Sequence, residues 1–333
     1  MRVCVYLENA GLLRSFGDTG IGNAAKLQRV ALQMNGVELE DDWRNDYEII
    51  DLNPVSFTEC MYVAKYAKKR GKKVVVHVHT TFENFANSFW FWKLTSPFVY
   101  RNMVKLYRMA DALICVSDYT RKWVESIGIR QSTFVIGNAI EVEKFRRGNR
   151  SYYRRLYGLE GVVPFCVGLV IPRKGIETFV NLARSFPELK FVWFGPLGKG
   201  LVRSFKAEQI VRSAPENVIF TGYVKDIVSA YAAGDIFVFP SLSETFGYVV
   251  LEALASGKPV IVRDLKVYSW LPRDLALRAK DDGEFRRKLS LLLENNRLRR
   301  KLSKKGPRFA KKFGPKEIGK KLVKAFEEVL AYN

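Results

Sequence analysis

The sequence predicts an α/β protein of two doubly wound, Rossmann-like domains that bind ligands in the cleft between them. Short apolar runs alternate with helical patterns along the chain, which favours parallel sheets covered by helices on both faces. The pattern breaks once, at the polar and basic stretch 146–150, and then restarts. Polar turns follow several apolar runs, and doubly wound domains bind ligands at the carboxyl ends of their strands. A chain of 333 residues is long enough for two such domains.

The first domain is expected to span residues 1–147. Its expected strands are Val3–Leu7, Tyr47–Leu52, Val74–Val78, Ala112–Val116 and Phe134–Ile136. Helical patterns lie near Ile21–Met34, Phe57–Arg70, Pro97–Met109 and Thr120–Ile127. Strands and helices therefore alternate, as in a parallel sheet with crossover helices.

The second domain is expected to span residues 148–313. Its expected strands are Phe165–Gly168, Phe191–Phe194, Val218–Thr221, Ile236–Phe239 and Val260–Val262. The tail 286–324 is helical and carries 16 Lys and Arg against two Glu. Gly306-Pro307 and Gly314-Pro315 are predicted to divide this tail into separate helices. The last helix, 314–333, is expected to pack back on the first domain.

The charge balance predicts an anionic partner. The chain has 55 Lys and Arg against 34 Asp and Glu, a formal net charge of +21. Nucleic acid, an acidic membrane surface and phosphorylated small molecules all fit such a charge. Known nucleic-acid motifs are absent from the sequence, which argues against the first.

Cysteine usage and hydropathy indicate a cytosolic protein without a membrane span. The four cysteines are far apart and form no CxxC pair, so buried reduced thiols are expected. The N-terminus resembles a first strand and not a signal peptide. No run reaches the roughly 18 apolar residues that cross a bilayer. Any contact with a membrane is therefore expected to be peripheral.

The stretch 240–257 combines the features of a sugar-nucleotide pocket. A buried strand, Ile236–Phe239, leads into a turn rich in hydroxyls and glycine, and an amphipathic helix begins near Tyr248. The unpaired N–H groups at a helix start attract phosphate. Glu244 precedes the helix and Glu252 lies inside it, a little over two turns later at about 3.6 residues per turn. The two carboxylates can therefore meet one ligand at different depths.

Two adjacent cations, Arg173 and Lys174, follow the strand Phe165–Gly168 on a turn. A planar guanidinium beside the point charge of an ammonium suits a diphosphate. A solvated basic loop is the alternative for this motif alone. The glutamate pair at a neighbouring strand end of the same domain favours the ligand site.

In the first domain a glycine pair and two histidines mark further strand ends. Gly20 and Gly22 open the first helix, where glycine lets the backbone approach a ligand; a simple tight turn is the alternative. His77 and His79 share one face of a strand. They are the only histidines and lack other ligands at metal-binding spacing, so no metal site is expected. His79, at the strand end, is the active-site candidate, and His77 is expected to be structural.

The segment 82–109 and the helix before it are both aromatic and basic. Aromatic side chains suit headgroup depth, and each cation near an anionic surface adds about 1 kcal/mol. We therefore expect an acceptor or membrane surface here; the alternative is that the aromatics are core and the charges solvated. The residues that mark this surface are Lys65, Lys68, Lys69, Arg70, Trp90 and Trp92.

Taken in order, these motifs resemble those of the retaining GT-B glycosyltransferases of family 4, over nearly the whole chain. The matching motifs are Gly20-Ile21-Gly22, His79-Thr80, Ala110–Ser117, Ile136-Gly137-Asn138, Lys174-Gly175 and Glu244 with Glu252. A finer similarity to the monoglycosyl-diacylglycerol synthases rests on the segments Thr19–Gly22, 77–89, 167–175, 191–195 and 260–264.

The resemblance implies a retaining hexosyltransferase that needs no metal or other cofactor. It would move glucose or a similar hexose from a nucleotide sugar such as UDP-glucose to a membrane lipid such as diacylglycerol. The alternative is a family 4 enzyme acting on a polysaccharide, a protein-linked glycan or a soluble acceptor. The implied partners are the donor, the lipid and an anionic membrane surface, at the inner face of the cell membrane, and not nucleic acid.

The resemblance also implies roles for individual residues. His79 would contact the donor sugar, Lys174 would neutralise the departing diphosphate, and Glu244 would hold sugar hydroxyls; these three are the implied catalytic residues. Glu252 would accept hydrogen bonds from the ribose. The implied donor-binding residues are Gly20, Gly22, Arg173, Thr245, Phe246, Gly247, Tyr248, Val249 and Glu252.

Three segments depart from the family's pattern. Leu169 stands where many members have arginine, which leaves Arg173 to replace that first phosphate cation. Asp51-Leu52-Asn53 occupies a strand end where relatives often carry histidine. Gly137-Asn138-Ala139 stands in place of Pro-Asn-Gly.

Overall fold

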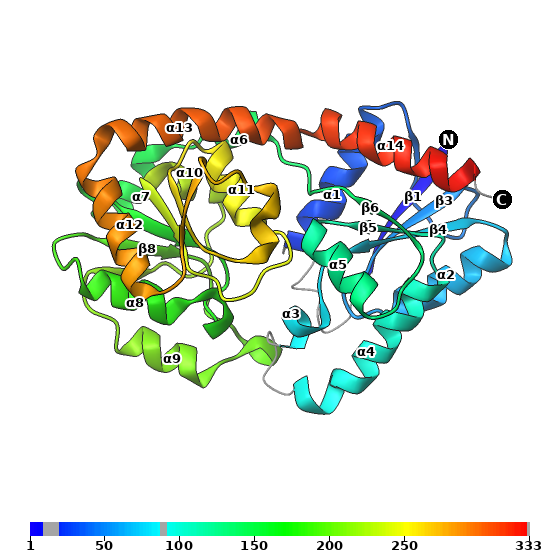
Figure 1. Cartoon of the computed structure of the whole chain (residues 1–333), viewed down its shortest axis with the longest axis horizontal. Helices are drawn as coiled ribbons and strands as arrows, with labels where there is room; N and C mark the ends of the chain where they lie inside the picture. The colour runs from blue at the N-terminus through cyan, green and yellow to red at the C-terminus, as the bar shows by residue number, and fades with distance from the viewer. Residues whose placement is uncertain (9–19, 87–91, 332–333) are drawn as a thin grey trace. The chain divides into compact units, whose positions relative to one another are not determined.

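The computed structural model describes residues 1–8, 20–86 and 92–331, which form two compact α/β units (Figure 1). Unit 1 comprises Met1–Ala86, Trp92–Ile140 and Lys312–Asn333, and unit 2 comprises Glu141–Lys311. The boundary follows Ile140 and not residue 147, because the helix α6 (Val142–Phe145) packs with helices of unit 2.

Unit 1 contains a six-stranded parallel sheet in the order β2-β1-β3-β4-β5-β6. Its strands are β1 (Arg2–Leu7), β2 (Glu38–Glu40), β3 (Ile49–Asn53), β4 (Lys73–Val78), β5 (Ala112–Cys115) and β6 (Ser132–Val135). Its helices are α1 (Gly20–Gln33), α2 (Thr58–Lys69), α3 (Phe82–Ala86), α4 (Trp92–Met109), α5 (Asp118–Ser126) and α14 (Pro315–Ala331).

Helices cover both faces of this sheet because alternate strand residues enter two separate cores. Val74 and Val76 of β4 belong to a core with α2, α4 and α5, whereas Val75 belongs to a core with α1 and α14. The terminal helix α14 lies along α1 (Figure 1). Gly319 makes this close approach possible, since a Cβ there would lie 2.1 Å from the Ala31 carbonyl oxygen.

Unit 2 contains a second six-stranded parallel sheet, in the order β12-β11-β10-β7-β8-β9. Its strands are β7 (Pro164–Val167), β8 (Phe191–Phe194), β9 (Val218–Phe220), β10 (Ile236–Phe239), β11 (Val260–Arg263) and β12 (Ala276–Ala279). Its further α-helices are α7 (Arg150–Leu156), α8 (Ile176–Arg184), α9 (Phe205–Arg212), α10 (Ile227–Ala233), α11 (Tyr248–Ala255), α12 (Asp282–Glu294) and α13 (Asn296–Ala310). The 3₁₀ turns are η2 (Pro172–Lys174), η3 (Gly200–Val202), η4 (Lys266–Trp270) and η5 (Lys311–Phe313).

Each sheet has a point where the strand order reverses, and ligands of doubly wound sheets bind at the carboxyl ends beside such a point. In unit 2 the reversal lies between β7 and β10, the strands followed by Arg173-Lys174 and by Glu244. In unit 1 it lies between β1 and β3. The topology therefore places the predicted donor residues of unit 2 at its switch point.

Two edge strands were not predicted from the sequence. β2 is a three-residue strand, Glu38–Glu40, with two acidic side chains, and β12 carries Arg278 on a four-residue strand. Each lies at an end of its sheet, where a charged, short strand is favoured because it resists pairing with another chain. Neither therefore shows the apolar run of a central strand.

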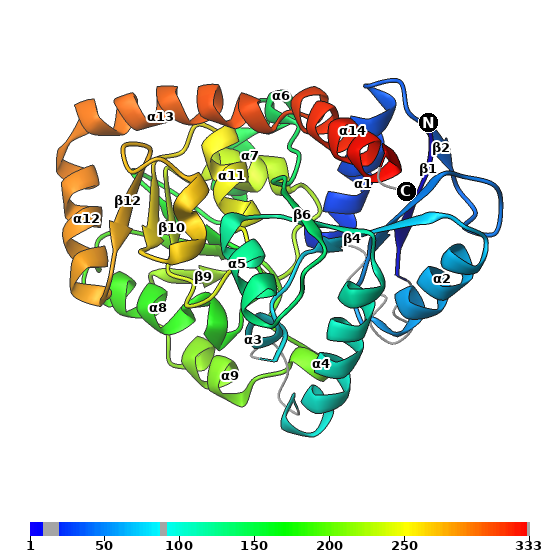
Figure 2. The ribbon, with the colours of Figure 1, turned by 45° about the vertical axis from the view of Figure 1, so that its right-hand side comes forward.

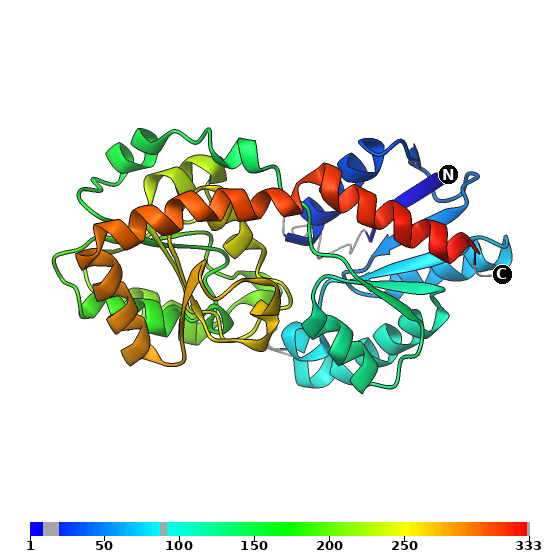
Figure 3. The same ribbon diagram turned by 45° about the horizontal axis from the view of Figure 1, so that its top comes forward.

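The predicted helix break at Gly306-Pro307 is wrong, because both residues lie inside α13. A Cβ at Gly306 would lie 2.7 Å from the Leu254 carbonyl oxygen, so the glycine lets α13 pack closely on α11 (Figures 2 and 3). An interior proline costs a helix roughly 3 kcal/mol. Burial of Leu302 and Ala310 on the same helix helps to offset that cost.

Candidate functional site

The loops after β7 and β10 in unit 2 are joined by backbone contacts. Leu242 N–H donates to the Arg173 carbonyl oxygen over 2.8 Å. Gly175 has a φ of +77°, and a Cβ there would lie 2.2 Å from the Pro240 carbonyl oxygen. Only glycine fits this position, so the two loops meet at the switch point of the sheet.

Lys174 and Glu244 form an ion pair at this junction. The Lys174 Nζ donates to Glu244 Oε1 over 2.6 Å, and the Ser241 hydroxyl donates to the same oxygen over 2.6 Å. Arg173 lies 3.8 Å from this carboxylate and donates to the Ser243 carbonyl oxygen. Burial alone would raise the pKa of Glu244, but the two cations and these hydrogen bonds hold it below its usual value.

The N-terminus of α11 follows directly. Gly247 precedes it with a φ of +79°, and a Cβ at this glycine would lie 2.7 Å from the Tyr268 ring. Phe246 is buried and stacks on Trp270, whose Nε1–H donates to the Phe246 carbonyl oxygen. The helix begins at Tyr248, as the sequence predicted, so the amides of 247–249 lie at the positive end of its dipole. Thr245 and Val249 flank this turn and are half-buried.

Glu252 lies in the second turn of α11 and is buried. The Tyr231 hydroxyl on α10 donates to its Oε2 over 2.7 Å. Burial raises the pKa of Glu252 to about 7, while the Tyr231 hydrogen bond and the Lys144 ammonium act in the opposite direction. The carboxylate is therefore held near the midpoint of its titration at neutral pH, a state found at many ligand-binding sites.

In unit 1 both histidines are paired with the neighbouring strand β3. His79 Nε2 lies 2.7 Å from Asn53 Oδ1, and His77 Nε2 lies 3.0 Å from the Asp51 carboxylate. Gln28 of α1 contacts His77 Nδ1 over 3.1 Å. His77 is thus fully engaged, whereas His79 lies beyond the end of β4.

The His79 imidazole is neutral at physiological pH. Burial, with the neighbouring His77 ring, lowers the pKa of His79 well below its usual value. The two rings stack with their centroids 5.5 Å apart. A neutral imidazole suits hydrogen bonding to a sugar hydroxyl better than ionic contact with phosphate.

Gly20 and Gly22 begin α1. Gly22 is buried, whereas Gly20 is exposed, and within the described chain nothing lies within 4 Å of the position of a Cβ at Gly20. Packing against described atoms therefore does not require glycine at residue 20. The residues before it in the loop, including Thr19, lie outside the described residues.

The basic end of α2 is only partly available to a partner. Lys68 pairs with Asp111 over 2.6 Å, and Arg70 donates to the Arg44 and Asn45 carbonyl oxygens. Lys65 and Lys69 are exposed and form no ion pair within the described chain. Trp90 and the side chain of Trp92 lie outside the described residues.

The hydrogen-bond partners of Glu252 and of the two histidines were not predicted from the sequence. Tyr231 has no local signal, because it meets Glu252 only through the packing of two helices. Asp51 and Asn53 did carry a local signal: they alternate on β3 with the same period as His77 on the neighbouring strand β4 and His79 just beyond its end. Alternating polar residues at adjacent strand ends predict side chains on one face.

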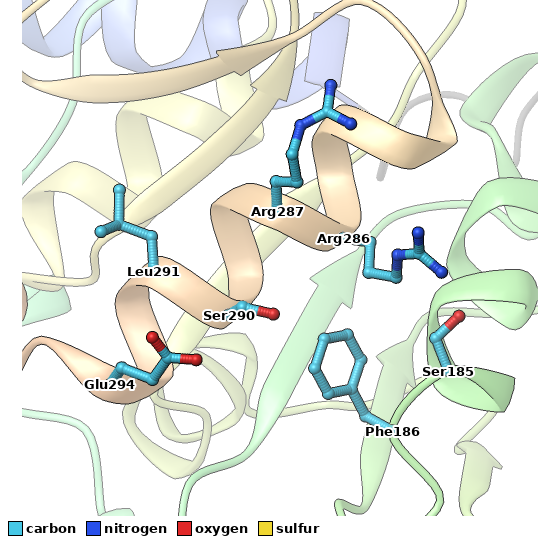
Figure 4. Close-up of a pocket in the computed structure, with 7 residues that line it drawn as sticks. All are labelled: Ser185, Phe186, Arg286, Arg287, Ser290, Leu291 and Glu294. Atoms are coloured by element: carbon cyan, nitrogen blue, oxygen red, sulfur yellow. The ribbon is translucent and has the colours of Figure 1, made fainter.

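An open depression of about 400 Å³ also lies between the end of α8 and α12 (Figure 4). Ser185 and Phe186 face Arg286 and Ser290 across it, and none of the predicted donor residues lines it.

In residues 1–8, 20–86 and 92–331, no group of three or more His, Cys, Asp or Glu could hold a metal ion. No helix in these ranges is long and apolar enough to cross a membrane.

Two family models match the chain. The model of the glycosyl transferases group 1 matches residues 160–309, and that of Glycosyltransferase Family 4 matches residues 37–144. These ranges contain the two switch-point loops of unit 2 and the strands β3 and β4 with both histidines.

Two proteins of similar sequence agree with the two family models. The processive diacylglycerol alpha-glucosyltransferase of Acholeplasma laidlawii is 32% identical over 339 residues, which cover 99% of each chain. The alpha-galactosylglucosyldiacylglycerol synthase of Streptococcus pneumoniae is 28% identical, over 62% of this chain and 58% of that protein.

Among solved structures, HepE of Anabaena in complex with UDP and glucose superposes with a TM-score of 0.80 at 16% identity, over 98% of this chain and 100% of that one. This likeness establishes the GT-B fold for the two parallel sheets. With both family models and a relative matched along its whole length, the chain belongs to the glycosyltransferases of family 4 and is a glycosyltransferase enzyme.

Proposed function

We propose that this glycosyltransferase moves glucose from UDP-glucose to a membrane lipid, diacylglycerol or a glycosylated diacylglycerol, with retention of anomeric configuration. The observation that carries the proposal is the similarity to the Acholeplasma laidlawii diacylglycerol alpha-glucosyltransferase along 99% of both chains. An α-linked product from an α-linked nucleotide sugar requires retention. The second relative also has a name that places its product among diacylglycerol glycolipids.

In this proposal the switch point of unit 2 binds the donor. Lys174 and Arg173 stabilise the negative charge that develops on the departing diphosphate, together with the dipole of α11. Glu244 holds sugar hydroxyls and positions Lys174 through the ion pair of 2.6 Å. Glu252 accepts hydrogen bonds from the ribose hydroxyls. These cationic and dipolar groups do the work of a divalent cation, so transfer is expected to persist in excess chelator.

In unit 1, His79 and the glycine pair are the residues proposed to contact substrate. A neutral His79, held through Asn53, contacts the donor sugar near the reacting carbon. Gly20 leaves room at the start of α1 for the sugar.

The enzyme is proposed to bind the cytoplasmic surface of the membrane peripherally. The exposed Lys65 and Lys69 on α2 lie beside Tyr62, which is 63% exposed. Cations next to an exposed aromatic ring suit an anionic lipid interface. Lys68 and Arg70, which contact the protein itself, contribute less to this surface.

The test is a transfer assay with radiolabelled nucleotide sugars and vesicles that contain diacylglycerol and an anionic lipid. UDP-glucose should give an α-linked glucolipid, in the presence of chelator as well as in its absence, and more slowly as salt screens the vesicle surface. If no common nucleotide sugar gives a lipid-linked product, the lipid acceptor is wrong. Transfer to a soluble sugar or glycan in the same assay would then identify the alternative acceptor class.

A further inference from the structure

The side of unit 2 formed by α7 and the first half of α13 carries a second basic surface. Two open depressions lie there, one of about 480 Å³ along α7 and one of about 350 Å³ beside α13. Arg150, Arg154 and Arg155 line the first, and Arg300 and Lys304 line the second. We call these five cations the α7–α13 surface. None of them belongs to the proposed donor site.

The acidic residue between the two depressions is already neutralised. Asp235 lines the second depression and forms ion pairs with Arg150 over 2.6 Å and Arg154 over 3.1 Å, both of which line the first. One carboxylate is therefore shared by two guanidinium groups. These ion pairs connect the two depressions and leave their junction with a net positive charge.

The other three cations of the surface have no such partner. Arg155, Arg300 and Lys304 are exposed and form no ion pair in the part of the chain that the structure describes. Arg300 and Lys304 are four residues apart on α13 and so point the same way. Glu160 is the other carboxylate that lines either depression, and it is exposed to solvent.

The rest of α13 extends the same charge. Every charged side chain of this helix is basic, and the exposed Arg297, Lys301 and Arg308 add to the cations of the surface. Arg299 differs, because its guanidinium donates to the Leu292 and Leu293 carbonyl oxygens at the end of α12. Arg299 therefore holds the helix in place and is not counted as a contact for a partner.

Exposed apolar side chains stand next to these cations. Tyr152 is 50% exposed and Leu156 is 59% exposed, and they lie four residues apart on the same face of α7. Arg155 is adjacent to Leu156. Surfaces that bind in the headgroup region of an anionic bilayer typically combine aromatic and aliphatic side chains with flanking Arg and Lys.

We propose that the α7–α13 surface docks on an anionic phospholipid bilayer, as a membrane contact of unit 2 that is separate from α2 of unit 1. The unpaired cations bind headgroup phosphates, and Tyr152 and Leu156 enter the interface. A bilayer fits better than nucleic acid because the exposed Tyr152 and Leu156 can enter a headgroup region, whereas Tyr153, the ring next to Tyr152, is buried and offers no second face on which a base could stack. The choice of a bilayer rests on the proposed function, but the docking can be measured without any transfer reaction.

The test is co-sedimentation of the full chain with vesicles of phosphatidylcholine, with and without phosphatidylglycerol. The variant Arg155→Glu/Arg300→Glu/Lys304→Glu should lose at least roughly 100-fold in partition coefficient on the anionic vesicles, since each cation near such a surface contributes roughly fivefold and each new Glu adds repulsion. The matched control is Arg212→Glu/Lys280→Glu/Arg286→Glu, an equal charge change at exposed residues of unit 2 away from this surface. The control should lose less than about tenfold.

Two further measurements, of thermal stabilisation and of duplex DNA binding, distinguish a loss of membrane docking from a loss of folding and from nucleic-acid binding. Thermal stabilisation by UDP-glucose should be equal in both triple variants, which shows that unit 2 is folded. Equal vesicle binding by the variant and its control would overturn the proposal, as would selective loss of duplex DNA binding with unchanged vesicle binding. Selective loss of vesicle binding would support it even if no lipid product is formed, so its failure and that of the proposed function remain distinguishable.

Discussion

Lys174 and Glu244 are each other's direct partners, which determines what a substitution of either can reveal. The pair is largely buried, with 15% and 10% of the side chains exposed. Removing one member of a buried pair leaves the other charge uncompensated and typically costs about 3–5 kcal/mol. Alanine at either position therefore combines a loss of stability with any loss of activity.

Glu244→Gln separates these effects. The amide keeps an acceptor for Lys174 and Ser241 but loses the charge, so the free energy of unfolding should fall by less than in Glu244→Ala. Turnover should fall about 100-fold or more, because in the proposed mechanism the Glu244 carboxylate positions Lys174 at the developing charge. Urea unfolding and the transfer assay measure the two quantities. Wild-type turnover in a folded Glu244→Gln enzyme would refute the assigned role.

Glu252 should make donor affinity depend on pH. Its folded pKa of about 7 lies above its usual value, and ribose hydroxyls bind better to the ionised form. UDP-glucose should therefore bind more tightly as pH rises, by up to roughly tenfold from about pH 6 to about pH 8. This donor has no phosphate that titrates in the range. Calorimetric titration should show that Glu252→Gln removes the pH dependence; a dependence of equal size in the variant would contradict the assignment.

Gly175 should be required for the junction of the loops after β7 and β10. Gly175→Ala adds a clash with the Pro240 carbonyl to the strain of a positive φ, a cost of roughly 2–4 kcal/mol. Gly161→Ala is the matched control, because its φ is also positive, +59°, but nothing lies within 4 Å of its Cβ position among the described atoms. It should cost only about 1 kcal/mol. Equal losses in urea unfolding would show that the loop contact adds nothing.

At the level of single residues the sequence predicts chemistry better than partners. The spacing of Glu244 and Glu252 predicted two acceptors around a helix start; Glu244 lies before α11 with 10% of its side chain exposed, and Glu252 is buried inside the helix. It did not predict that Lys174 binds Glu244 or that Tyr231 binds Glu252, since these pairs are far apart in sequence. Such contacts depend on how strands and helices pack, which no local pattern encodes.

Among the elements, α2 is held in place by a carboxylate from another segment. Glu8 follows β1 and is 4% exposed. Its Oε2 accepts the N–H groups of Val55, Ser56 and Phe57, and its Oε1 accepts that of Glu59. Phe57, the residue before the helix, has a φ of +70°. A negative charge at a helix N-terminus is favourable, and here it also offsets this strained backbone.

Glu8→Ala should destabilise unit 1 because several buried N–H groups lose their acceptor. The expected loss is roughly 3–5 kcal/mol in the free energy of unfolding, and Glu8→Gln should lose less because it keeps one acceptor oxygen. Urea unfolding measures both. Hydrogen exchange of the first turn of α2 should speed up in both variants. A loss below about 1 kcal/mol in Glu8→Ala would mean that water replaces the carboxylate.

The order of elements was predictable where hydrophobic runs are strong and was missed where they are weak. The central strands β8 and β10 have the expected bounds, and α11 begins at the predicted residue. The edge strands β2 and β12 lack an apolar run and were missed. Gly306-Pro307 normally ends a helix, but packing on α11 outweighs that local preference.

For the molecule as a whole, the sequence predicted two doubly wound units, and the topology identifies where each can bind a ligand. Both sheets are parallel, and the strand order reverses once in each. The predicted donor residues Lys174 and Glu244 meet at such a reversal although they lie about 70 residues apart in sequence. The net charge of +21 adds a long-range attraction for anionic partners.

Hydrogen exchange with UDP-glucose tests the central claim, that the donor binds at the switch point of unit 2. Mass spectrometry of the full chain, with and without saturating donor, locates the amides that the ligand protects. Exchange should slow in the loops 168–176 and 241–252, and UDP alone should protect the same segments. Protection confined to other parts of unit 2, such as the depression between α8 and α12, would contradict the account.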